Sequence, residues 1–479
     1  MSTSTEGPKQ DLADHSSSST PGSQQTVFTI KLNGTEKEDK LNEKSSEKKP
    51  DKPLAENNEE FSPPDGGWGW VVMIASMVLI LLTDGIAFSV GTIYPTIRDD
   101  FNSESTKASL ISALINAFSL LTGPVASVLA DSYGHRVVVI SGSIISGVAF
   151  VAASFSPNID VAILTYGFLA GTGFSLMYVS SVVVVGQYFE RRRALAIGIA
   201  SSGSGIGIFL ISAITGALLN VISWRTVSLI EAALMILGIL SGLTLHPLPK
   251  PKENKEKISK RKLLMKRLDI TLFKMPAYNT ICMVFILATI GCILPYMYIP
   301  DVAQELDIES ERSAFLLSIT GITNTVSRML CGFVVYRFPI LSPILLLAGI
   351  CCIGGILSFF VFLFTSYLSL AIYAAIVGFV YAADAALTPL VLIEIVGYSR
   401  LNSSVGFMCM FRGFPILIAG PIGGYLRDVT GKYDATFFMA GSTLLVSALF
   451  CLITWFIIRM SKCKTYTLSK VKTETVTIS

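Results

Sequence analysis

The segment Lys250–Arg267, KPKENKEKISKRKLLMKR, holds nine Lys or Arg residues against two Glu residues, and long apolar runs flank it on both sides. Loops that stay on the cytoplasmic side of a membrane are enriched in Lys and Arg. The segment therefore predicts a cytoplasmic connection between two groups of membrane-spanning helices. Anionic lipid or nucleic acid is an alternative partner for so basic a loop, but the topological signal explains the charge without any partner.

The composition indicates that most of the chain lies inside a membrane. Of 479 residues, 51% are hydrophobic and 15% are charged, and the mean hydropathy is +0.61. A soluble protein carries about 25% charged residues. Residues 1–63 are polar instead. We expect them to form a disordered cytoplasmic tail, because they have too few apolar side chains to offset the entropy lost on ordering.

Apolar runs of roughly 20 residues, the length that crosses a bilayer, recur along the rest of the chain. The twelve predicted spans are 70–94, 108–130, 137–156, 161–186, 194–217, 224–246, 275–299, 313–335, 341–363, 368–395, 404–426 and 435–458. The predicted domains are the tail 1–63, a six-helix bundle 64–246, the basic loop 247–274, a second six-helix bundle 275–458 and a cytoplasmic tail 459–479.

Other basic loops fix the orientation. DSYGHR at 131–136 and ERRR at 190–193 lie on the same side as the central loop if there are twelve spans. Both termini are then expected in the cytoplasm. Six helices, a cytoplasmic loop and six more helices resemble the major facilitator superfamily, whose halves are repeats with the substrate between them. The expected fold class is an all-α membrane protein, the twelve-helix major facilitator fold with 6+6 pseudo-symmetric halves.

One loop adds to this resemblance. LADSYGHRVVV at 129–139 is similar to the superfamily's loop between spans two and three. The resemblance implies that Asp131 and Arg136 form a charged pair that latches the cytoplasmic face. The arginines at 190–193 are expected to lie at the inner membrane surface and to hold their loop against acidic partners. These arginines are Arg191, Arg192 and Arg193.

Two stretches narrow the resemblance further. PDGGWGW at 64–70 and YFERRRALAIGIASSGSGIG at 188–207 resemble the two signatures of the monocarboxylate transporter family, solute carrier family sixteen. The resemblance implies a plasma-membrane carrier of small organic monocarboxylates that works by alternating access. It also implies a single-span immunoglobulin-like chaperone as a candidate partner, since several members need one.

The first signature can also be read from its residues. Trp68 and Trp70 are expected at the inner headgroup level, where an indole ring has one wet edge and one apolar face. The glycines, Gly66 among them, let the chain turn as it enters span one. Asp65 is expected to cap the start of that span. In the second signature, Gly198, Gly203 and Gly207 permit close helix approach.

Ionisable residues inside the predicted spans are candidates for function, because burying a charge in a bilayer is costly. Asp84, Arg328, Asp384 and Arg412 come out about 9–21 Å from the inner end at 1.5 Å per residue, so they are expected to share one region. Glu231 lies on a peripheral span near the outer end, and a structural role is expected for it.

Arg328 and Asn324 are predicted substrate-binding residues, and Arg328 is the central one since a guanidinium fork matches a carboxylate. Asp84, Asp384 and Arg412 are expected to balance charge or gate. A structural ion pair of Arg328 with Asp384 is the alternative. Phe88 and Tyr178 are predicted to shape the pocket.

The resemblance does not extend to proton coupling. Proton-coupled members carry a Lys in span one, where this chain has Phe88, and an Asp four residues before the Arg, where it has Asn324. A proton-independent carrier of amino-acid-like or zwitterionic solutes is therefore a second hypothesis, and a proton stays a candidate co-substrate. A non-transporting sensor or scaffold is a third. No enzyme signature, metal cluster or cofactor motif is found, so no cofactor is expected.

Overall fold

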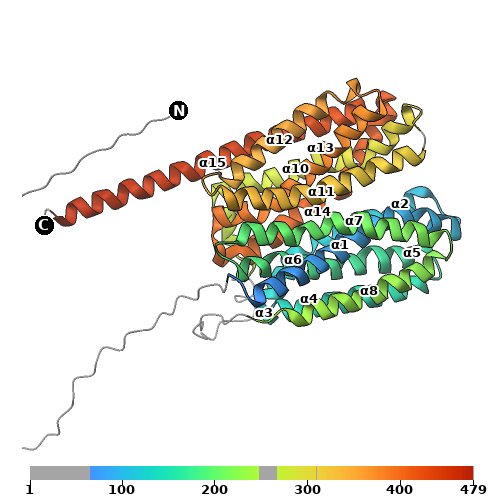
Figure 1. The fold of residues 1–479 in the computed structure, drawn as a ribbon, viewed down its shortest axis with the longest axis horizontal. Coiled ribbons are helices and arrows are strands. Elements are labelled where there is room, and N and C mark those ends of the chain that lie inside the picture. Colours follow the sequence, from blue (N-terminus) through green and yellow to red (C-terminus); the bar gives the residue numbers. More distant parts are fainter. Residues whose placement is uncertain (1–64, 248–266, 309, 478–479) are drawn as a thin grey trace, which may run out of the picture. The chain divides into compact units, whose positions relative to one another are not determined.

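The computed structural model describes residues 65–247, 267–308 and 310–477, and every regular element in these ranges is a helix (Figure 1). The predicted tail 1–63 and most of the basic loop 247–274 lie outside the described residues. The contacts reported below belong to one compact unit, Glu60–Ser479.

The first half of the bundle comprises nine consecutive helical segments. They are α1 (Trp68–Asp100), α2 (Ser105–Leu121), α3 (Gly123–Tyr133), α4 (His135–Ser154), α5 (Ile159–Ala162), the π-helix η1 (Ile163–Leu169), α6 (Ala170–Tyr188), α7 (Arg193–Leu219) and α8 (Trp224–Thr244).

The second half continues after the basic loop. It comprises η2 (Ile270–Lys274), α10 (Pro276–Glu305), α11 (Ser310–Arg337), α12 (Pro343–Phe359), η3 (Val361–Leu363), α13 (Tyr367–Val396), η4 (Tyr398–Arg400), α14 (Leu401–Thr430) and α15 (Asp434–Thr477).

Each predicted span corresponds to one helix or to consecutive helical segments. Nine helical stretches among the described residues are long and apolar enough to cross a membrane. The predicted span 108–130 is instead the pair α2 and α3, bent by 45°. Pro124 explains the bend, because proline has no N–H to donate into the preceding turn. Helix α12 is a shorter apolar helix, and α11 carries Arg328 within its span.

The last helix is longer than predicted. Its apolar part is Asp434–Ser461, close to the predicted span 435–458, but the helix runs on to Thr477 through the segment predicted as a tail. The helix-forming Lys and Glu residues after Arg459, and the absence of Gly and Pro there, favour this continuation.

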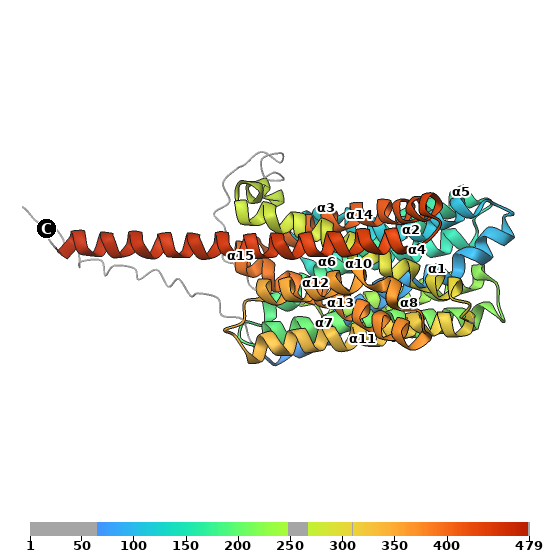
Figure 2. The same ribbon diagram turned by 90° about the horizontal axis from the view of Figure 1, so that it is seen from above.

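The two halves meet along two lines of helix contact. Helix α7 packs on α11, as both views show (Figures 1 and 2), and α14 packs on α2 and α3. Within the halves, α1 packs on α7, α4 on α8, α11 on α13, and α10 and α12 on α15.

Glycines allow the halves to approach closely. A Cβ atom added at Gly332 of α11 would lie 2.6 Å from the carbonyl oxygen of Ala194 and 2.8 Å from the Cα of Gly198, both on α7. On the other line, a Cβ at Gly123 would lie 2.5 Å from the carbonyl oxygen of Gly406. The predicted signature glycines therefore allow α7 to approach two helices. Gly198 faces α11, whereas Gly203 and Gly207 face α1.

Candidate functional site: a charged cluster between the two halves

The two family signatures bind each other at one end of the bundle, which we call the signature end. The Asp65 carboxylate accepts hydrogen bonds from the backbone N–H groups of Glu190 (2.7 Å) and Arg191 (3.0 Å), and the Asp65 N–H donates to the carbonyl of Tyr188 (3.1 Å). The prediction that Asp65 caps span one is therefore wrong. Its φ of 47° turns the carboxylate toward the loop that leads into α7, whose unpaired N–H groups need an acceptor.

Electrostatics support this contact. Burial by itself would raise the pKa of the Asp65 carboxyl, but the N–H groups of Glu190, Arg191 and Arg192 outweigh it and lower that pKa. The N–H groups thus prefer the ionised form of the carboxylate.

Both signature tryptophans have partners near this end. Trp70 packs edge-on against Phe189 with 5.1 Å between ring centroids. The Trp68 indole N–H donates to the carbonyl of Thr244 (2.9 Å), and 49% of the residue remains exposed. The Gly66 carbonyl accepts from the N–H of Gly69 (3.0 Å). The contacts of the first signature therefore attach the start of α1 to the loop between α6 and α7.

We expect Asp65→Ala to lower the free energy of unfolding by about 1–2 kcal/mol, because at least two N–H groups lose a charged acceptor at a partly exposed site. Thermal unfolding of the purified protein in detergent measures this. Asp65→Asn keeps one acceptor oxygen and should lose less. An alanine variant as stable as the parent would contradict the role of this contact.

The signature end also carries contacts between the two halves. Asp131 of α3 accepts a hydrogen bond from the side chain of Asn402 of α14. The Arg267 side chain donates to Ser132 of α3, while its carbonyl accepts from Ser403 of α14 (2.7 Å). Asp131 thus joins the two halves.

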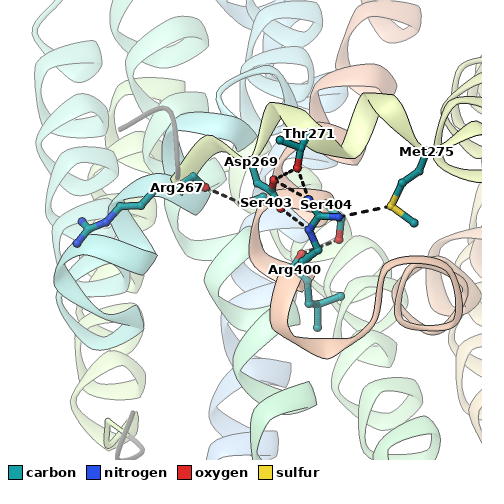
Figure 3. Close-up of polar contacts among 8 residues, drawn as sticks. Arg267, Asp269, Thr271, Met275, Arg400, Ser403 and Ser404 are labelled. Carbon is teal, nitrogen blue, oxygen red and sulfur yellow. Dashed lines mark hydrogen bonds and ion pairs between the residues drawn. The ribbon is translucent and has the colours of Figure 1, made fainter. Parts of the chain in front are cut away.

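A second cluster braces the stretch before α10 (Figure 3). The Arg400 guanidinium binds Asp269 through Nε (2.5 Å) and Nη2 (2.8 Å), and also contacts Thr271 and the Met275 sulfur. Burial alone would raise the pKa of Asp269, but the Arg400 and Thr271 hydrogen bonds outweigh it and lower that pKa. The brace fixes residues 269–275 to the start of α14.

The predicted latch arginines have different environments. Arg193 donates from Nε to the carbonyls of Gly186 (3.1 Å) and Phe189 (2.8 Å), and its guanidinium lies 5.1 Å from the ring of Tyr398 in the second half. Arg191 and Arg192 are exposed, and their backbone N–H groups face Asp65. Arg136 is exposed at the start of α4.

Deeper in the bundle, Arg412 and Asp384 form a buried ion pair. Arg412 Nη2 lies 2.7 Å from Asp384 Oδ2 and donates to the Thr388 hydroxyl at 2.7 Å, and the guanidinium lies 5.3 Å from the Phe285 ring centroid. The predicted alternative pair of Arg328 with Asp384 is therefore wrong. The side chains from α13 and α14 face each other, whereas Arg328 turns toward its own helix.

Arg328 is held by one nitrogen only. Its Nε donates to Oδ1 of Asn324, one turn earlier on α11, at 2.9 Å. Among the described residues, neither terminal nitrogen of Arg328 has a hydrogen-bond partner, and no carboxylate lies within 4.0 Å of the guanidinium, although the residue is only 2% exposed. Asn324 therefore orients a guanidinium fork whose two outer nitrogens remain available.

Asp84 is the partly exposed counterpart in the first half. It is half-buried on α1 and interacts with the Ser204 hydroxyl of α7, and within the described ranges it takes part in no ion pair. It still interacts electrostatically with Arg328, and Tyr178 of α6 interacts with both charges. An acid in one half and a base in the other thus interact electrostatically, and within the described ranges neither belongs to an ion pair.

The helix bounds place this cluster well inside the helical bundle. Arg328, Asp384 and Arg412 lie about 14–18 Å from the signature end, and Asp84 about 24 Å from it, at 1.5 Å per residue. The structure thus brings together the four charges that the sequence placed in one region. Sequence reasoning missed Thr388 and Phe285. The spacing of four residues between Asp384 and Thr388 was the available signal for the former.

Glu231 lies apart from the cluster. It is 2% exposed on α8 and accepts a hydrogen bond from the Tyr166 hydroxyl of η1. This local contact agrees with the expected structural role. Among the described residues, no group of three or more His, Cys, Asp or Glu side chains has the arrangement of a metal site.

The sequence profile of the Major Facilitator Superfamily matches residues 72–383. The chain belongs to this superfamily. It is therefore a membrane transporter that works by alternating access and not an enzyme. The third hypothesis, a non-transporting sensor or scaffold, is set aside.

Relatives and solved structures agree. Monocarboxylate transporter 12-B of Danio rerio is 29% identical over 420 residues, which cover 81% of this chain and 87% of the relative. Monocarboxylate transporter 2 of Mus musculus is 28% identical and monocarboxylate transporter 1 of Homo sapiens 26% identical; each alignment covers 82% of this chain, with 84% and 86% of the relatives. These relatives confirm the resemblance to the monocarboxylate transporter family.

The fold has solved counterparts. The outward conformation of the transporter FucP superposes with a TM-score of 0.59 at 16% identity, covering 81% of this chain and 99% of FucP. The proton:xylose symporter XylE superposes with a TM-score of 0.61 at 12% identity, covering 80% of this chain and 95% of XylE. At these identities the similarity concerns the fold alone, and it confirms the predicted fold class.

Proposed function

We propose that this transporter carries small organic monocarboxylates across the plasma membrane and that Arg328 binds their carboxylate. The observation that supports this most directly is the buried guanidinium of Arg328, whose two terminal nitrogens have no acceptor among the described residues. A carboxylate accepts two parallel hydrogen bonds from such a fork. The names of the relatives support the same substrate class.

Alternating access gives the charges a second role. A carboxylate on Arg328 would neutralise the guanidinium and leave Asp84 as the uncompensated charge of the cluster. A ligand that changes the balance of charge between the halves binds the inward- and outward-facing states with different affinities. This difference in affinity shifts the populations of the two states. Cytoplasmic termini and a single-span immunoglobulin-like chaperone remain parts of this proposal.

A second candidate is a carrier of zwitterionic solutes. Asp84 lies near Arg328 and has no cationic partner within hydrogen-bond reach in the described part of the chain. A solute with a carboxylate and an ammonium or guanidinium group would pair with both residues. Phe88 and Asn324, in place of the Lys and Asp of proton-coupled members, favour the same reading.

Radiotracer uptake by oocytes that express the full chain tests both candidates. The panel compares lactate, an aromatic amino acid, and creatine- or carnitine-like zwitterions at neutral and mildly acidic pH. We expect saturable uptake of lactate, and Asp84→Asn should slow that uptake without abolishing it, because the carboxylate binds Arg328 and Asp84 contributes to the change of state. Loss of zwitterion uptake alone in Asp84→Asn would instead establish the second candidate. No uptake of any solute by protein at the cell surface would contradict both candidates.

A further inference from the structure

A pair of aromatic rings lies next to the charged cluster, on the side away from the signature end. The ring of Phe88 on α1 lies 5.5 Å from that of Tyr296 on α10, edge to face, and Tyr296 lies 6.1 Å from Tyr381 on α13. The first contact joins the two halves. Edge-to-face pairs are favourable arrangements of aromatic side chains.

The order of residues along the helices fixes which side of the cluster the rings occupy. Helix α1 begins at the signature end and α13 ends there, as Asp65 and Tyr398 show. Phe88 follows Asp84 by one turn on α1, and Tyr381 precedes Asp384 by one turn on α13. Phe88 therefore lies about 30 Å from the signature end, beyond every charge of the cluster.

The hydroxyl groups around the cluster are available to a solute. Tyr178, Tyr296 and Tyr381 are each half-buried. None of their hydroxyls is hydrogen-bonded to another described residue, and none is among the fully buried polar atoms that lack a partner. Tyr178 and Tyr381 interact electrostatically with both Asp84 and Arg328. Aromatic faces and hydroxyls without a hydrogen-bond partner among the described residues therefore lie near the charged cluster.

We propose that Phe88 and Tyr296 determine which carboxylates are transported, by limiting the bulk of the group attached to the carboxylate. This inference rests on the proposed function, since it assumes a carboxylate on Arg328. The carboxylate end of the solute lies at the charges, and its other end points toward the rings. The distance from the fork to the Phe88–Tyr296 pair then sets the length that fits.

The residue type at position 88 determines whether the contact with Tyr296 can form. The family resemblance implies a Lys in the proton-coupled members at this point of span one, where this chain has Phe88. A flexible cationic side chain cannot form the edge-to-face contact with Tyr296. In this chain the apolar ring of Phe88 stands in place of the Lys charge. The transporter would then select solutes by their shape and less by their charge.

The test is uptake of a graded series of 2-oxo acids, from pyruvate through 4-methyl-2-oxopentanoate to phenylpyruvate, by the full chain in oocytes. For Phe88→Ala we expect the ratio of kcat/KM for phenylpyruvate to that for pyruvate to rise about tenfold or more, because a pocket discriminates by this factor for each group it excludes. Tyr296→Ala should give a similar rise. The double variant should give less than the product of the two, since both changes remove one contact.

Two controls separate this role from general damage. Tyr296→Phe keeps the ring pair and should keep the parental ratio. Phe118→Ala breaks an equivalent edge-to-face pair, Phe118–Phe168 at 4.5 Å, that lies between α2 and η1. Phe88→Leu retains apolar bulk, and it replaces Phe88→Ala if the alanine variant does not reach the surface; we expect an intermediate rise in the ratio.

The outcomes distinguish the inference from the proposal beneath it. An unchanged ratio in both ring variants, with pyruvate still transported, would overturn the inference and leave the proposed function intact. An equal change in Phe118→Ala would also overturn it. If the parental chain transports no 2-oxo acid at all, the proposed function fails and the inference with it.

Discussion

Replacing Arg328 by glutamine should reduce carboxylate uptake by about 100-fold or more in kcat/KM. Two charge-assisted hydrogen bonds would be lost, and a hydrogen bond to a charged group contributes about 1.5–3 kcal/mol. Glutamine keeps a hydrogen-bond donor and much of the side-chain volume, so the loss reports on the guanidinium fork. Initial uptake rates, normalised to the protein at the cell surface, measure the effect.

The controls for Arg328 use the same helix and the same residue type. Arg328→Lys keeps the charge but not the fork and should retain only part of the activity, because a lysine donates as a point charge. Arg337→Gln removes an exposed arginine from the end of α11 and should transport like the parent. Full uptake by Arg328→Gln would remove the central residue of the proposed site.

The environment of Arg412 supports the proposal that Arg328, and not Arg412, binds the substrate. Arg412 already binds Asp384 and Thr388 and packs on Phe285, so a substrate would have to displace an existing ion pair. In the described part of the chain, Arg328 donates a hydrogen bond only to Asn324. The family resemblance implies an Asp at the position of Asn324 in the proton-coupled members. A neutral amide orients the fork without neutralising it.

Much of the fold was predictable, because each span is a long apolar run and the basic loop divides the chain into two groups. The depth of the buried charges was also predictable, since it follows from counting residues along a helix. Their pairing was not. Arg328 and Arg412 lie at similar depth, so depth alone cannot decide which of them reaches Asp384. That choice depends on how α13 and α14 are rotated about their axes.

The contact between the two signatures was likewise beyond the sequence. Asp65 and Glu190 are 125 residues apart, and both stretches looked complete as local features. A local rule assigned Asp65 to the nearest helix start. The structure assigns it to a distant one because the positive φ at Asp65 turns its side chain away from α1. Local rules fail where a tertiary contact offers better donors.

The ion pair of Arg412 with Asp384 should be the most costly single contact to break. Asp384 is 2% exposed and the Arg412 side chain 11%, so Asp384→Asn leaves a buried cation without its counter-charge. Removing one partner of a buried pair costs about 3–5 kcal/mol. We expect a fall of this size in the free energy of unfolding, together with poor surface expression, measured by thermal unfolding in detergent and by surface labelling.

A double variant separates pairing from packing. Asp384→Asn combined with Arg412→Gln removes both charges and keeps the side-chain volumes, so it should be more stable than either single variant, because no unpaired charge remains in the bilayer. The exposed pair of Lys107 with Asp160, at 3.1 Å, supplies the matched control. Asp160→Asn should change stability by about 1 kcal/mol or less, since water and salt screen that pair. A double variant as unstable as Asp384→Asn would show that the ion pair stabilises the protein through packing and not through charge. The lost stability would then be assigned to repacking between α13 and α14.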